Sequence, residues 1–119
     1  MSAFGKSFVY AAKGIALGCG GRNFRVMLGV AVVVMAVGWW LGLPPGHWAV
    51  LALSMGLVLA LELVNTAGEM LVDILCPDFD PRYGQVKDVL AGAVLLAAVM
   101  TAVVGILVLA RPLWERLVG

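Results

Sequence analysis

Charged side chains are scarce in this chain. They make up 13 % of its 119 residues, whereas hydrophobic residues make up 63 %. Together with a mean hydropathy of +1.05, this composition argues against a soluble domain and indicates a membrane protein. The formal net charge of +1 indicates no affinity for nucleic acid. The length, and the lack of any internal repeat or linker, predict a single membrane domain over residues 1–119.

Cysteine, histidine and early acidic residues are also rare. The two cysteines, Cys19 and Cys76, form no Cys-x-x-Cys pair, so we expect reduced thiols without a redox or structural role. The one histidine, His47, falls in a Pro-Pro-Gly-His run that is predicted to be a turn between spans, which argues against a histidine-dependent phosphatase. The first 25 residues carry four basic residues and no long apolar core, so no cleavable signal peptide is expected.

Three long apolar segments predict membrane-spanning helices. These segments are residues 26–43, 48–76 and 87–110. The first carries Trp39 and Trp40 at its far end, which is typical of an aromatic anchor at a membrane interface. The last is rich in Ala and Gly, which favour close contacts between membrane helices. The predicted fold is therefore all-α, with three transmembrane helices.

A surface helix is expected before the first span, over residues 3–21. Phe4 and Phe8 fall on one face of this helix, and Lys6 and Lys13 project near the opposite face, a pattern typical of an amphipathic helix lying in the membrane interface. Six of the eight basic residues fall on the same side of the predicted membrane as this helix. The positive-inside rule places that side in the cytoplasm.

The second predicted span continues into a polar stripe. Helical rotation of about 100° per residue places Glu62, Asn65, Thr66, Glu69 and Asp73 within an arc roughly 100° wide, while the residues between them remain apolar. Acidic residues at membrane depth are costly and mark functional sites. Such a stripe suits Mg²⁺ bound together with substrate phosphates, and phosphoryl transfer to a lipid alcohol. A proton or cation pathway would use the same groups.

Three blocks of sequence resemble a known family. Residues 62–69 read Glu-Leu-Val-Asn-Thr-Ala-Gly-Glu, and Val-Asp follows at 72–73. This run resembles the signature of the prokaryotic diacylglycerol kinase family, which includes the undecaprenol kinases. Residues 87–96 (Lys-Asp-Val-Leu-Ala-Gly-Ala-Val-Leu-Leu) resemble its second block, and residues 22–25 (Arg-Asn-Phe-Arg) a third. The order, the spacing and the helix plan agree over nearly the whole chain.

The resemblance implies a small homotrimer in the bacterial cytoplasmic (inner) membrane, with its active site facing the cytoplasm. The implied activity is transfer of the ATP γ-phosphate, with Mg²⁺, to a membrane lipid alcohol, either undecaprenol or diacylglycerol. Glu62 would be the catalytic base, Asn65 would hold the base or the phosphates, and Glu69 would bind the metal. The expected ATP-binding residues are Asp73, Lys87, Asp88, Asp78, Phe79, Asp80 and Tyr10. Asn23 and Arg25 are expected to support the lipid or the structure.

One position departs from the family pattern. The family normally places a metal-binding Glu where this chain has Gly21, and no acidic residue precedes Glu62. The metal would then be held by Glu69 with phosphates and water alone, or Asp78 or Asp80 would substitute for the missing ligand. The third reading is a catalytically weak relative. We expect an active kinase, with a non-enzymatic membrane oligomer that conducts protons or cations as the alternative.

Overall fold

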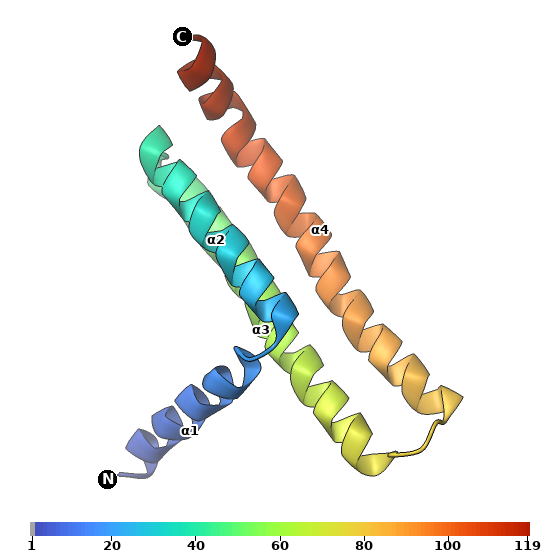
Figure 1. Ribbon diagram of the computed structural model, residues 1–119. Helices are drawn as coiled ribbons and strands as arrows, with labels where there is room; N and C mark the ends of the chain where they lie inside the picture. Colours follow the sequence, from blue (N-terminus) through green and yellow to red (C-terminus); the bar gives the residue numbers. More distant parts are fainter. Residues whose placement is uncertain (1) are drawn as a thin grey trace.

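The computed structural model describes residues 2–119, which form four helices and no strand. The helices are α1 (Ala3–Gly18), α2 (Arg22–Leu41), α3 (Pro45–Leu75) and α4 (Pro81–Val118). Figure 1 shows the axes of α2, α3 and α4 at similar inclinations, with α3 antiparallel to the other two, while α1 projects away from them. The principal extents are 59 × 43 × 20 Å. The all-α architecture predicted from the sequence is confirmed.

Three of the helices are long and apolar enough to cross a membrane: α2, α3 and α4. Large apolar side chains cover much of their outer surface. Leu53 of α3 is 77 % exposed and Leu107 of α4 is 75 % exposed, although soluble monomers rarely expose extended apolar patches. The chain is therefore a multi-pass membrane protein. The predicted homotrimer stays a prediction.

The turn between α2 and α3 differs from the prediction. Gly42, in the left-handed region at φ 68°, ends α2, and its N–H donates to the carbonyl of Gly38. Pro45 begins α3, because a proline in the first turn of a helix loses no hydrogen bond. His47 therefore lies in the first turn of α3 rather than in the turn between the helices, and the prediction for this residue is wrong.

The other helices also differ in length from the predicted segments. α1 ends at Gly18, three residues before the predicted end, and α4 continues past Pro112 to Val118. α4 begins at Pro81, where the Asp80 side chain accepts a hydrogen bond from the Arg82 N–H at 2.9 Å. Polar residues extend α2 and α4 beyond their apolar stretches, so the membrane-spanning ranges themselves stay predictions.

Close approaches fix the packing at the polar end of α3. A Cβ on Gly68 would overlap the Leu90 side chain of α4, and a Cβ on Gly18 would overlap Leu63. Glycine at these two positions therefore lets α4 and the end of α1 lie against α3. Deeper in the bundle, the Thr101 hydroxyl lies 2.8 Å from the Ala97 carbonyl oxygen and 3.2 Å from that of Ser54. This contact sets the level of α4 against α3.

Candidate functional site

One face of α3 is buried along its whole length. Its buried residues are Leu51, Val58, Glu62, Asn65 and Val72. Spacings of three, four and seven residues place them all on one side of the helix. The buried residues are apolar at Leu51, Val58 and Val72 and polar at Glu62 and Asn65. Glu62 and Asn65 are only 5 % and 6 % exposed, so this part of the predicted stripe faces protein, whereas Glu69 and Asp73 are exposed.

The Asn65 side chain links the buried and exposed parts of the stripe. Its Nδ2 donates to Glu69 Oε1 at 3.3 Å, whereas its Oδ1 is buried and has no hydrogen-bond partner within residues 2–119. Buried polar atoms without a partner are uncommon in proteins. The amide therefore orients the Glu69 carboxylate, while its own oxygen has no partner.

Glu69 is exposed at the surface of α3, and its carboxylate could hold a metal. Across the described part of the chain, no three His, Cys, Asp or Glu side chains gather around a common point. Asp78 and Asp80 therefore do not build a three-ligand site with Glu69. Gly21, the N-cap of α2, has no side chain to offer. One oriented carboxylate fits Mg²⁺, which is commonly bound by one or two carboxylates with substrate phosphates and water.

An ion pair joins α3 and α4 beside this carboxylate. Lys87 Nζ lies 2.5 Å from Asp73 Oδ1, and their side chains are 39 % and 66 % exposed. Asp73 lies one helical turn beyond Glu69 on α3. Exposed ion pairs contribute little to stability, so breaking the pair between Lys87 and Asp73 would cost little. The structure thus brings two of the predicted ATP-binding residues together.

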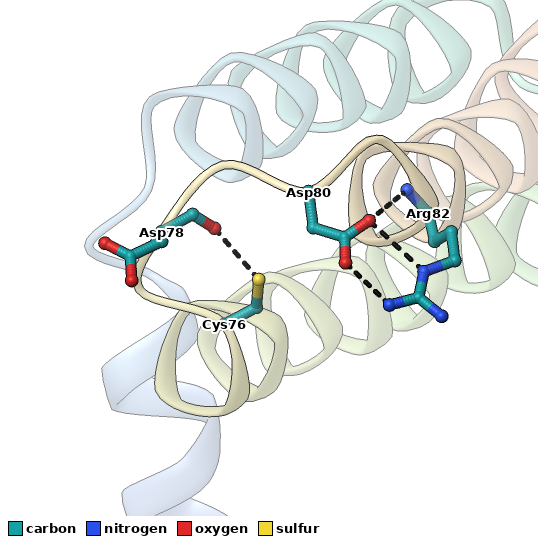
Figure 2. Close-up of polar contacts among 4 residues, drawn as sticks. All are labelled: Cys76, Asp78, Asp80 and Arg82. Atoms are coloured by element: carbon teal, nitrogen blue, oxygen red, sulfur yellow. Dashed lines mark hydrogen bonds and ion pairs between the residues drawn. The ribbon is translucent and has the colours of Figure 1, made fainter.

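The loop between α3 and α4 carries a second set of polar contacts. Figure 2 shows the Cys76 thiol donating to the Asp78 carbonyl oxygen at 2.9 Å, while the Asp78 carboxylate points away from these contacts. The Asp80 carboxylate pairs with Arg82, whose Nη2 lies 2.8 Å from Oδ2 (Figure 2). Phe79 is 91 % exposed. The sequence analysis did not predict that Asp80 caps α4 and pairs with Arg82. An Asp directly before a Pro is nevertheless a recognisable signal for the start of a helix.

The remaining predicted residues lie apart from the stripe or have structural contacts. Tyr10 of α1 is 66 % exposed, with Lys13 Nζ 5.8 Å from the centre of its ring. Arg25 Nε donates to the Cys19 carbonyl oxygen at 3.3 Å and braces the turn between α1 and α2. Asn23 and Asp88 are exposed. The ligand roles expected for these residues stay predictions.

Hydrogen bonds from the Arg82 side chain, and then from its backbone N–H, hold the pKa of Asp80 below its ordinary value of 3.8. The contribution of this carboxylate to stability is therefore fully present above the unfolded pKa and is lost as the pH falls through the folded pKa. We expect hydrogen-exchange protection factors in the first turn of α4 to decrease as the pH falls from the unfolded pKa of Asp80 through its folded pKa. Asp80→Asn keeps a capping acceptor without the charge, so the protection factors of this variant should not change over the same pH range. Equal acid sensitivity in both proteins would contradict the assignment.

Comparisons with known proteins agree with the geometry. The family model described as prokaryotic diacylglycerol kinase matches residues 9–109. The chain is 35 % identical over 109 residues to a Bacillus subtilis protein named undecaprenol kinase, covering 91 % of this chain and 89 % of that protein. It is 40 % identical over 114 residues to a Synechocystis protein named diacylglycerol kinase, covering 94 % of this chain and 65 % of that protein.

Proposed function

Because the chain belongs to the prokaryotic diacylglycerol kinase family, it is a membrane lipid kinase, and we propose that it transfers the γ-phosphate of ATP to the hydroxyl of a lipid alcohol. The observation that carries this proposal is one face of α3 that leads from a buried carboxylate, Glu62, to an exposed one, Glu69. Lys87 of α4 lies beside the exposed end. The names of the relatives suggest undecaprenol or diacylglycerol as the acceptor.

We propose the following roles for the residues on this face. Glu62 accepts the proton of the lipid hydroxyl as the hydroxyl oxygen attacks the γ-phosphorus. The bond from that phosphorus to the β–γ bridging oxygen breaks, and ADP leaves. Lys87 neutralises phosphate charge, and Asn65 holds the Glu69 carboxylate and offers Oδ1 to a donor. Glu69 would hold Mg²⁺, which when bound neutralises charge on the β- and γ-phosphates.

The environment of the enzyme is also part of the proposal. We propose the bacterial cytoplasmic membrane, with the Lys87 end of α4 facing the cytoplasm, because six of the eight basic residues fall on that side. A homotrimer is the assembly that the family resemblance implies. A proton or cation pathway along the stripe is not favoured, since both relatives are named as kinases.

A direct test supplies purified protein with γ-labelled ATP, Mg²⁺ and either undecaprenol or a diacylglycerol in mixed micelles. We expect a labelled lipid phosphate with at least one acceptor, and loss of that product when EDTA removes the metal. Micelles without an acceptor are the control for ATP hydrolysis. Protein that binds ATP but labels neither lipid would overturn the proposed reaction.

A further inference from the structure

Arg116, near the end of α4, is a cation without a carboxylate partner in the described part of the chain. Its guanidinium carbon lies 5.2 Å from the centre of the Trp40 ring of α2, and no ion pair within residues 2–119 includes it. The adjacent acid, Glu115, pairs with Arg111 at 2.8 Å. Because no acidic residue precedes Glu62, α2 offers no carboxylate either. The charge of Arg116 is therefore held in place without being neutralised.

The contact with Trp40 leaves the hydrogen-bonding groups of Arg116 available. A guanidinium over an aromatic ring uses its face for the contact, while its N–H donors project around its edge. Arg116 is also exposed. The fork of N–H donors matches two oxygens of a phosphate, and such charge-assisted pairs are among the stronger hydrogen bonds in proteins. Trp40 thus keeps a group suited to phosphate ready at the surface.

The length of α4 places Arg116 at the level of lipid headgroups. The 22 uncharged residues from Val89 to Ala110 extend about 33 Å, which covers a hydrocarbon core about 30 Å thick. Arg116 lies about 9 Å further along the helix axis, and the headgroup layer on each side of the core is about 5 to 8 Å deep. An arginine side chain can bend back toward the bilayer over this distance. Its guanidinium therefore meets the layer that holds the lipid phosphates.

Exposed indole rings mark the same layer. Trp39 of α2 is 84 % exposed and Trp114 of α4 is 68 % exposed, and tryptophan is enriched where membrane meets water. Figure 1 shows the end of α2 and the end of α4 on the same side of the bundle. Both Trp114 and Arg116 lie beyond residues 9–109, the segment that matches the family model. This position is therefore separate from the face of α3 that carries the proposed chemistry.

We propose that Arg116, held by Trp40, binds the phosphate of an anionic phospholipid in the leaflet on the far side of the membrane from Lys87. A headgroup such as that of phosphatidylglycerol brings one negative charge, which neutralises Arg116, whereas a zwitterionic headgroup also brings a cation. The bound lipid would bridge two helices, because the guanidinium belongs to α4 and the ring to α2. This site depends neither on the proposed reaction nor on the direction in which the chain is inserted.

The test uses tryptophan fluorescence, because all four tryptophans lie at this end of the three long helices. Bromine quenches only nearby indole rings, so brominated lipid bound at the opposite end of the bundle gives no signal. Protein in neutral maltoside micelles is titrated with brominated phosphatidylglycerol or with brominated phosphatidylcholine. For the wild type, the apparent Kd of phosphatidylglycerol should be lower by about tenfold or more, the effect expected of hydrogen bonds to a charged group.

Two variants with the same change of net charge separate a site from a general charge effect. Arg116→Gln should lose the preference for phosphatidylglycerol. Arg111→Gln should keep it, because Arg111 pairs with Glu115 and lies roughly 140° around α4 from Arg116. Arg116→Lys keeps the charge without the planar fork, so it should keep only part of the preference.

Several outcomes would overturn the proposal. Equal quenching of the wild type by the two lipids would remove the preference on which it stands. An equal loss in Arg116→Gln and Arg111→Gln would replace the site by a diffuse effect of net charge. Millimolar inorganic phosphate should not restore the fluorescence, and restoration would assign the site to a soluble anion instead of a lipid. Melting temperatures without phospholipid should be the same in all variants, because Arg116 and Arg111 are exposed.

Discussion

Replacing Glu62 with Gln should lower kcat by about 10²- to 10⁴-fold, the contribution typical of general acid–base catalysis. Glutamine has nearly the volume of glutamate, so it keeps the packing of this buried position, but it has no carboxylate to accept the lipid proton. ATP affinity should stay close to that of the wild type, because the proposed nucleotide contacts lie toward Glu69 and Lys87. Initial rates with saturating lipid, together with equilibrium ATP binding, would separate the two effects.

Glu115→Gln is a matched control for this variant. Glu115 pairs with Arg111 on α4, near the end that lies away from Lys87 (Figure 1), so removal of its charge should leave kcat unchanged. Wild-type kcat in Glu62→Gln would show that another group accepts the proton. Loss of ATP binding together with kcat would instead place Glu62 in the nucleotide site.

Replacing Glu69 with Gln should weaken Mg²⁺ binding at fixed ATP by more than the roughly 10- to 100-fold that loss of an outer-shell partner typically costs. The glutamine carbonyl oxygen can still accept the Asn65 Nδ2 hydrogen bond that Glu69 accepts now. The substitution therefore removes charge from the proposed metal ligand and keeps its position. Excess Mg²⁺ should restore part of the activity, because the lost ligand acts through metal affinity.

A Mg²⁺ titration of the rate, run in parallel on wild type and Glu69→Gln, measures this effect. Asp78→Asn tests the alternative that a loop acid replaces the ligand missing at Gly21. Since the Asp78 carboxylate points away from the neighbouring loop contacts (Figure 2), its Mg²⁺ dependence should match that of the wild type. A titration unchanged by Glu69→Gln would remove this residue from the metal site.

The sequence was sufficient for the part of the site that lies on one helix. Residues on α3 share a face because of helical periodicity alone, so the order from Glu62 through Asn65 to Glu69 could be predicted before the structure. The helix ends were not predicted. They depend on local capping, as where Gly42 adopts the left-handed conformation and Asp80 caps α4. Neither length nor hydropathy carries that information.

Contacts between helices were harder to predict. The sequence placed Asp73 and Lys87 near the same membrane surface, but their pairing depends on how the loop from Cys76 to Asp80 turns the chain. The orientation of the Asn65 amide also depends on its neighbour one turn away. Periodicity within α1 also does not predict where Tyr10 lies relative to the other helices, because α1 projects away from their bundle (Figure 1).

The length of α4 ties the chemistry to the thickness of the surrounding bilayer. Its 38 residues extend about 57 Å, nearly twice the hydrocarbon core. Lys87 contacts Asp73 of α3 near the beginning of α4, and Arg116 lies 5.2 Å from the Trp40 ring centre of α2 near its end. A helix held near both ends tilts together with its neighbours when the membrane is thinner, so Lys87 stays beside Asp73. The contacts at the two ends of α4 would thus keep the three long helices in register as the bilayer thickness changes.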